Sequence, residues 1–300
     1  MPSEVNGNTS RATYLDDLNR FLDLAAGHFD SAWMVDHLQT GDAGEMESFT
    51  SIAYMAALHP QFKFGSAVLS QSFRNPALLA KMGATLQLLS GGRFILGLGA
   101  GWHEGEYQTY GYDFPSNRVR VEQLDETLQI IRALWTEEKV SFTGKYYRVQ
   151  EAHCRPKPDP LPPIMIGAFK PKMLRLTARY ADWWNVSSTG PVGYRSMAAE
   201  FNRACQEIGR DPASVRRTWI GGCACAATQQ AAEELAGDRF SAQDDADFGF
   251  VGTPRQIVAQ MQRFIDLGMD TFILDCQDFP KLDGLQRLIN EVIPAVKEIR

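Results

Sequence analysis

His37 is the residue of this chain best placed to move a proton. It comes just after residues 31–35, a short apolar stretch that predicts a buried strand, and Asp36 stands beside it. An imidazole gives or takes a proton near neutral pH, and a neighbouring carboxylate can orient its ring. A histidine that is hydrogen-bonded beneath a loop is the structural alternative. We therefore take His37 as the candidate catalytic acid or base.

A glycine-rich turn provides a second candidate site. Residues 93–102, RFILGLGAGW, pass from an apolar run into alternating glycines, as a buried strand does where backbone must approach a ligand. The match to the dinucleotide fingerprint G-x-G-x-x-G is superficial, because the pattern needs glycine where Trp102 stands. The acidic strand end expected about 20 residues later is also missing. A nicotinamide cofactor is therefore disfavoured.

Two later turns have the composition of an anion site. Residues 167–172 and 187–190 combine glycines, serine hydroxyls and the lysines Lys170 and Lys172, and both precede predicted helices. Backbone N–H groups at a helix N-terminus bind phosphate well. Glycine and serine are also common in ordinary loops. The composition therefore admits both a phosphate site and plain turns.

The elements that position these residues alternate along the chain. Apolar patterns predict seven strands, at residues 31–35, 62–69, 94–96, 164–166, 183–186, 217–225 and 271–276. Eight helical segments are predicted around them, at residues 14–24, 48–58, 75–89, 119–135, 172–181, 194–209, within 228–267 and at 282–299. Alternation of this kind suits a doubly wound sheet or a (β/α)8 TIM barrel, and the length favours the barrel.

We expect one domain over residues 1–300. Residues 139–160 are predicted to leave the barrel as a hairpin with a proline-rich exit, and residues 237–250 to form a charged loop. The loop over residues 38–46 and the charged loop would shape the pocket, although neither carries a recognisable substrate motif.

Composition excludes several classes of protein. The formal charge of −6, from 30 basic and 36 acidic residues, leaves no basic patch for a nucleic acid. No apolar stretch approaches the roughly 20 residues of a membrane span, and the first residues lack a secretion signal, so we expect a cytoplasmic location. Five cysteines without C-x-x-C spacing predict reduced, buried thiols. The predicted strand ends carry few histidines and carboxylates, so no metal site is expected.

Five stretches give the chain a family resemblance. They are FDSAWMVDH at residues 29–37, the long stretch over residues 63–111, RVEQLDETLQIIRALW at 120–135, residues 162–186, and VGTP followed by LGMDTFIL near the end. The chain resembles the luciferase-like flavin-dependent oxidoreductases, most closely their coenzyme F420 (deazaflavin) branch. This resemblance implies a luciferase-like TIM barrel, a homodimer, a small-molecule organic substrate, and either F420 or FMN at the barrel mouth.

The resemblance also implies a set of site residues. His37 would be catalytic and Asp36 would flank the cofactor ring, while Ala67 and Val68 would form a non-prolyl cis peptide behind it and Ser70 would touch its polar edge. The residues expected against the ring and side chain are Gly99, Ala100, Gly101 and Trp102, with Glu106 supporting their loop. Those expected around the phosphate or ribityl groups are Gly167, Ala168, Ser187, Ser188 and Gly190.

Relatives in this family begin with a short apolar strand, which this chain lacks at its start. Residues 1–10 are MPSEVNGNTS, so we expect the first barrel strand to be missing or degenerate, with this segment either disordered or forming that degenerate strand. Either the true start lies upstream, or a seven-strand barrel leaves two open edges that something must cover. We therefore predict a gap beside the first and last of the seven strands.

Three functions follow as hypotheses from the resemblance. The first is hydride transfer between a deazaflavin and a small organic substrate, with His37 supplying or removing the accompanying proton. The second is an FMN-dependent monooxygenase of the alkane or alkanesulfonate type, which inserts one oxygen atom from O2. The third is a flavoprotein that binds its cofactor without turnover.

Overall fold

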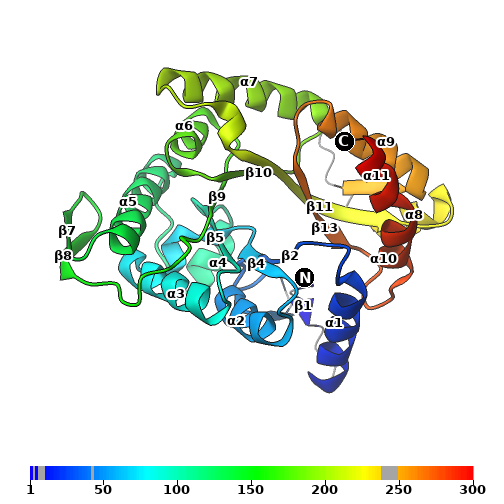
Figure 1. The fold of residues 1–300 in the computed structure, drawn as a ribbon, viewed down its shortest axis with the longest axis horizontal. Helices are drawn as coiled ribbons and strands as arrows, with labels where there is room; N and C mark the ends of the chain where they lie inside the picture. The colour runs from blue at the N-terminus through cyan, green and yellow to red at the C-terminus, as the bar shows by residue number, and fades with distance from the viewer. Residues whose placement is uncertain (3, 6–10, 42–43, 238–248, 300) are drawn as a thin grey trace.

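Parallel strands form the central sheet of the protein, and helices cover its outer side. The computed structural model describes residues 1–2, 4–5, 11–41, 44–237 and 249–299 (Figure 1). In their order across the sheet, the barrel strands are β2 (Ser31–Met34), β4 (Lys63–Ser66), β6 (Phe94–Gly99), β9 (Ile164–Gly167), β10 (Trp183–Ser187), β11 (Arg216–Cys225) and β13 (Thr271–Cys276).

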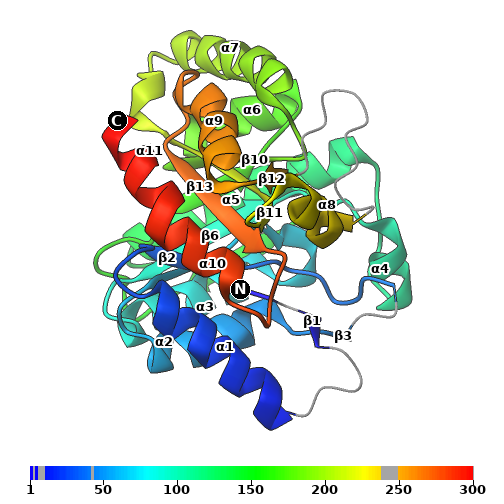
Figure 2. The same cartoon turned by 90° about the vertical axis from the view of Figure 1, so that its right-hand side faces the viewer.

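Helices connect these strands and form the outer layer (Figures 1 and 2). In chain order they are α1 (Arg11–Ala25), α2 (Ser48–Leu58), α3 (Pro76–Leu89), α4 (Glu104–Thr109), α5 (Asn117–Thr136), α6 (Pro171–Tyr180), α7 (Pro191–Glu207), α8 (Gln229–Ala236), α9 (Pro254–Ile265), α10 (Asp283–Arg287) and α11 (Ile293–Ile299). A π-helical turn, η4 (Leu288–Val292), joins α10 to α11, and 3-10 turns lie at η1 (Gln71–Phe73) and η2 (Pro212–Ser214). The predicted alternation and barrel architecture are confirmed.

The barrel lacks one strand, as predicted. Among the described residues, β2 pairs only with β4, and β13 pairs only with β11, so the two strands leave a gap between them. Near the start of the chain, β1 (Glu4–Val5) instead pairs antiparallel with β3 (Gly44–Glu45), outside the barrel sheet. The polar sequence there cannot supply the apolar side chains that a strand buried on both faces needs. The other residues of the predicted disordered segment, 3 and 6–10, lie outside the described part.

Several short elements were not predicted, among them β1, β3, β5, β12 and α4. The two-residue strand β5 (Leu69–Ser70) pairs with β6, and β12 (Gly249–Gly252) pairs with the end of β11. Helix α4 is too short to show a helical period in the sequence. The predicted hairpin is present as β7 (Val140–Thr143) and β8 (Arg148–Ala152). Most of the predicted charged loop, residues 238–248, lies outside the described residues.

The barrel interior is a packed core below its mouth. Trp33, Ile95, Met165 and Ile273 come from four different strands and form one buried cluster. Gly65 lies against Trp33, since a Cβ atom on it would be 2.5 Å from the indole ring. Filled interiors of this kind are the rule in parallel barrels, where the carboxyl ends of the strands carry the site. The cluster therefore forms the floor of any site at the mouth.

Gly97 on β6 gives a testable prediction about packing. A Cβ atom there would lie 1.8 Å from the Ser66 carbonyl oxygen, so any side chain forces the backbone apart. We expect Gly97→Ala to lower the free energy of unfolding by about 3 kcal/mol, measured by urea denaturation. The matched control is Gly105→Ala, whose Cβ would have His103 as its nearest neighbour at 3.5 Å. Equal stability of the two variants would show that the close approach at Gly97 is relaxed in solution.

All five cysteines are free and buried, which confirms the prediction of reduced, buried thiols. Burial raises the pKa of Cys225 to about 11 and that of Cys223 further above its ordinary value. Thiols of this kind stay protonated at neutral pH and are poor nucleophiles. Among the described residues, no helix has the length and apolar character of a membrane span.

Candidate functional site

His37 lies at the mouth of the barrel and is held there by Glu106. Its Nδ1 atom is 3.2 Å from one carboxylate oxygen of Glu106 and 3.3 Å from the other. An ionised carboxylate only accepts hydrogen bonds, so this contact places the ring proton on Nδ1 and leaves Nε2 as the free base. Glu106 also accepts the backbone N–H of Leu38 at 2.9 Å and is itself buried. The pair is therefore a positioned proton acceptor or donor.

The structure corrects the expectation that Asp36 orients His37. Both carboxylate oxygens of Asp36 accept hydrogen bonds from Arg74, at 2.8 and 2.9 Å, and one also accepts the backbone N–H of Ser70 at 2.9 Å. Only 1% of the Asp36 side chain is exposed, which leaves it no open face toward a ligand. Asp36 and His37 therefore take different partners, although they are neighbours in the sequence. Asp36 therefore anchors the loop instead.

Arg74 is a residue that the sequence did not single out. Burial acts to lower its pKa, but hydrogen bonds and charge from Asp36 and Glu47 outweigh this effect, and the net shift is upward. Burial acts to raise the pKa of Glu47, but the contacts from Thr50 and Arg74 outweigh this effect. The pKa of Glu47 is therefore lowered overall. The contribution of Glu47 to stability is therefore complete at pH values above the ordinary carboxyl pKa. It is lost as the pH falls through the lowered pKa of Glu47 in the folded protein. Arg74 remains charged throughout this range.

The loop after β6 forms another wall of the site. Trp102 is 71% exposed, and its ring lies edge-on to that of His37 with the centroids 5.7 Å apart. Gly101 has a φ of +80°, and a Cβ on it would meet the hydroxyl of Tyr107 at 1.8 Å. That hydroxyl is hydrogen-bonded to the Ser70 side chain. The position therefore requires glycine for two reasons, and the preceding Ala100 is half-buried.

The peptide bond between Ala67 and Val68 is cis, as expected. The Val68 side chain fills the space over two glycines, since Cβ atoms on Gly99 and Gly167 would lie 2.7 and 3.1 Å from it. Both glycines therefore make room for Val68, which covers the barrel interior beneath the mouth.

The two turns predicted to bind an anion lie next to each other. They follow the adjacent strands β9 and β10 and lead into α6 and α7, which begin at Pro171 and Pro191. No side chain caps either helix, whereas Asn75 caps α3 and Thr228 caps α8 by accepting first-turn N–H groups. The open N–H groups of α6 and α7 are therefore available to an anion.

The residues around the starts of α6 and α7 differ in their exposure and in the hydrogen-bond donors that they have free for a phosphate. Ser187 is half-buried and Ser188 is exposed with a φ of +49°, while Gly190 is buried at the start of α7. Ala168 is fully buried, and its N–H and C=O groups are used by Asn185 and Trp184. Ala168 therefore has no free donor to offer a phosphate, in contrast to the expectation from the family resemblance.

No group of three or more histidine, cysteine, aspartate or glutamate side chains within the described ranges is arranged to hold a metal ion. His37 and His103 lie near each other, with ring centroids 6.2 Å apart. The Nδ1 atom of His103 accepts the backbone N–H of Glu106 at 3.2 Å and so caps α4. The His37–Glu106 contact joins residues 69 positions apart, and only the HEGEY sequence next to the glycine turn could have hinted at it.

The curated proteins to which the chain is similar are redox enzymes. It is 33% identical over 191 residues to an F420-dependent hydroxymycolic acid dehydrogenase of Mycobacterium tuberculosis, with 62% of this chain and 52% of the relative covered. It is 37% identical over 165 residues to an F420-dependent glucose-6-phosphate dehydrogenase of Nocardia farcinica, with 53% of this chain and 49% of the relative covered. The chain thus spans about half the length of the curated relatives that it matches.

Solved structures share the fold. An F420-dependent secondary alcohol dehydrogenase has a TM-score of 0.81 at 21% identity, with 96% of each chain covered. A monooxygenase from Streptomyces bottropensis has a TM-score of 0.83 at 20% identity, with 98% of this chain and 97% of that chain covered. The family model for luciferase-like monooxygenases matches residues 2–247, which is most of the chain. The chain therefore belongs to the luciferase-like monooxygenase family.

Proposed function

We propose that this protein is an F420-dependent oxidoreductase that transfers a hydride between the deazaflavin and a small organic substrate. The observation that carries the proposal is the His37–Glu106 pair at the barrel mouth, which provides one oriented proton acceptor. The names of similar proteins describe F420-dependent dehydrogenases, and these names refer to hydroxyl-bearing substrates. We therefore propose that the reaction interconverts an alcohol and a carbonyl compound.

The residues at the mouth fit a deazaflavin with an anionic side chain. Trp102 offers apolar contact beside His37, and Val68 offers an apolar surface over Gly99 and Gly167. The uncapped starts of α6 and α7 offer N–H groups to a phosphate. The proposed set for the ring is Val68, Ser70, Gly101 and Trp102. For the phosphate it is Gly167, Ser187, Ser188 and Gly190. When bound, the deazaflavin would supply the hydride acceptor or donor.

The protein's own contribution is the handling of the proton. In alcohol oxidation the hydroxyl proton would pass to Nε2 of His37 as the C–H hydride leaves, and the imidazolium would be stabilised by Glu106. Reduction of the carbonyl would reverse both transfers. The packed floor formed by Trp33 and its neighbours and the covering Val68 side chain exclude water from below.

Equilibrium titration of the purified protein with F420 and with FMN tests the cofactor directly. We expect F420 to bind at least about tenfold more tightly than FMN, followed by the change in cofactor fluorescence. Tighter binding of FMN would favour the monooxygenase function instead. If neither cofactor binds, both proposals are contradicted.

The Glu106→Gln variant tests whether Glu106 orients the imidazole of His37 or only fills the space beside it. Glutamine keeps the size of the side chain but can present a donor to Nδ1, which permits the wrong tautomer. We expect kcat to fall by roughly 10²- to 10⁴-fold with little change in KM, because the wrong tautomer cannot accept the substrate proton. A variant with unchanged kcat would remove Glu106 from the mechanism.

We further propose that the protein is a homodimer of the cytoplasm. Helices α2 and α3 lie side by side in both views and expose several large apolar side chains (Figures 1 and 2). These are Tyr54, Leu58, Leu78, Leu88 and Leu89. Exposed apolar patches of this kind commonly mark contacts between proteins. Sedimentation analysis should give twice the mass of one chain, and Leu78→Lys with Leu89→Lys should give the monomer.

A further inference from the structure

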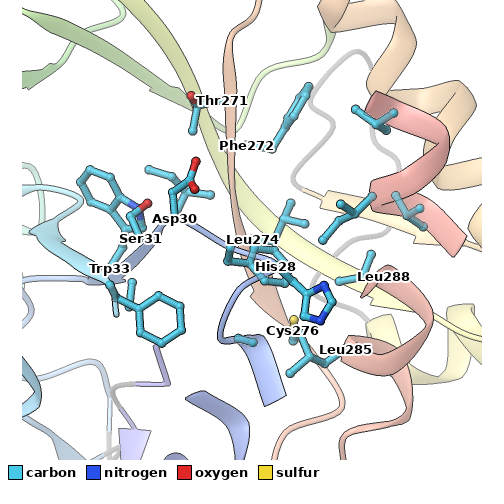
Figure 3. A pocket seen from close by; sticks show the side chains of 18 of the residues that line it. His28, Asp30, Ser31, Trp33, Thr271, Phe272, Leu274, Cys276, Leu285 and Leu288 are labelled. Carbon is cyan, nitrogen blue, oxygen red and sulfur yellow. The ribbon is translucent and has the colours of Figure 1, made fainter. Parts of the chain in front are cut away.

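His103 is the second histidine at the barrel mouth, and the proposed proton transfer does not use it. The chain has five histidines. His28 lines the cavity between β2 and β13, on the amino side of β2 (Figure 3), His59 is buried at the end of α2, and His153 is exposed beside the hairpin. The ring centroids of His37 and His103 are 6.2 Å apart. Of the other four histidines, His103 is therefore the one placed to influence His37.

A single hydrogen bond connects His103 to the residue that orients His37. The Nδ1 atom of His103 accepts the backbone N–H of Glu106 at 3.2 Å. The carboxylate of the same Glu106 lies 3.2 Å from Nδ1 of His37. The three residues therefore form a chain of contacts, in which His103 fixes the backbone of Glu106 and Glu106 fixes the imidazole of His37.

Helix α4, which carries Glu106, depends on this cap. It has six residues, and a helix of this length has little stability of its own. Side-chain oxygen atoms of Asn75 and Thr228 cap α3 and α8, and such oxygens accept an N–H group over the whole physiological pH range. In α4 a ring nitrogen of His103 takes this role. The cap of α4 is therefore one that a proton can remove.

A ring nitrogen accepts a hydrogen bond only while it carries no proton. Neutral His103 with its proton on Nε2 can cap α4, whereas the imidazolium has a proton on both nitrogen atoms and can only donate. A positive charge at a helix N-terminus also opposes the helix dipole. The groups that can act on His103 are His37 after β2, Glu104 and Glu106 of α4, and Arg120 of α5, whose charge interacts with that of Glu104.

We propose that His103 is a positioning residue, whose neutral ring caps α4 and so holds Glu106 against His37, and that protonation of His103 releases this hold. Once His103 is an imidazolium, the first turn of α4 has lost its acceptor. The Glu106 carboxylate then keeps only the Leu38 N–H and no longer fixes the proton of His37 on Nδ1. The effect of His103 on kcat rests on the proposed function, whereas its effect on the His37 ring does not.

Nitrogen-15 NMR of the imidazole rings, on the protein without cofactor, tests this role. At about pH 8 an ordinary imidazole is almost entirely neutral, so each ring reports its tautomer. In His103→Ala we expect the fraction of His37 with its proton on Nε2 to rise at least about fivefold. His103→Asn should keep the tautomer of the unaltered protein, because the asparagine oxygen can cap α4. Thr228→Ala, which removes the cap of α8, is the matched control and should leave His37 unchanged.

Two outcomes of this measurement would overturn the proposal. One is an unchanged His37 tautomer in His103→Ala. The other is an equal change in Thr228→Ala, because the effect would then follow from the loss of any helix cap. A His37 ring that carries its proton on Nε2 in the unaltered protein would contradict the proposed function as well, since Glu106 would not orient it.

The pH dependence of kcat for alcohol oxidation separates the two histidines. With both present, log kcat should fall on the acid side with a limiting slope of about two, and with a slope of about one in His103→Asn, whose cap does not titrate. At about pH 8, His103→Ala should lower kcat roughly 10- to 100-fold through misplacement of His37, and His103→Asn should recover most of this loss. A slope of two in His103→Asn, or equal kcat in the two variants, would overturn the proposal.

Discussion

Replacing His37 with alanine should lower kcat by roughly 10²- to 10⁴-fold, the usual contribution of a positioned acid or base. The variant lacks the one imidazole that Glu106 holds at the barrel mouth. Affinity for F420 should change by no more than a few-fold, because the anion site at α6 and α7 is untouched. Steady-state kinetics and a cofactor titration on the same sample measure both quantities.

The control for this variant is His153→Ala, which removes an exposed histidine from beside the hairpin. It should leave kcat and cofactor affinity unchanged. An unchanged kcat in His37→Ala would rule out the proton-transfer role. A parallel loss of cofactor affinity would instead show that His37 serves mainly to bind the ring.

Replacing Arg74 with methionine should lower the free energy of unfolding by about 3 to 5 kcal/mol. The substitution leaves the carboxylate of Asp36 buried without its cation, and breaking a buried ion pair from one side is strongly destabilising. Urea denaturation measures the loss. Arg118→Met is the matched control, because this arginine pairs with Glu122 at the surface and is 73% exposed. Exposed pairs contribute only about 0 to 1 kcal/mol.

A double variant identifies the cause of the loss. Combining Arg74→Met with Asp36→Asn removes the buried charge, so we expect it to recover a large part of the stability. If the double variant is as unstable as Arg74→Met alone, the cost comes from packing of the arginine side chain. If Arg74→Met is no worse than Arg118→Met, the ion pair with Asp36 does not anchor the loop.

The fold was largely predictable because its strands and helices carry their own periodic patterns. The strand from Thr271 to Cys276 and the helix from Ser48 to Leu58 end at the predicted residues. The missing first strand was also visible, since a polar start cannot form a strand that is buried on both faces. The strands β5 and β12 were not predictable in this way. They are too short to show a pattern and exist only because β6 and β11 lie beside them.

The site was only partly predictable, because its contacts join distant parts of the chain. His37 could be recognised from its residue type and its place after a strand. Its partner was expected at Asp36, the nearest carboxylate in the sequence, but the structure brings in Glu106. Arg74 gave no signal because a lone arginine before a helix has many possible roles. The glycines of the β6 turn were predicted from the sequence, but the close approach of Val68 to Gly99 could not be predicted, because it joins residues from two different strand ends.

The most direct test of the proposed function is turnover with F420 and a panel of secondary alcohols, with an oxygen electrode in the same cell. We predict that the protein reduces F420 at the expense of at least one alcohol, and that oxygen uptake stays at the level without enzyme. Consumption of oxygen with reduced FMN, together with no reduction of F420 by any alcohol, would contradict the account.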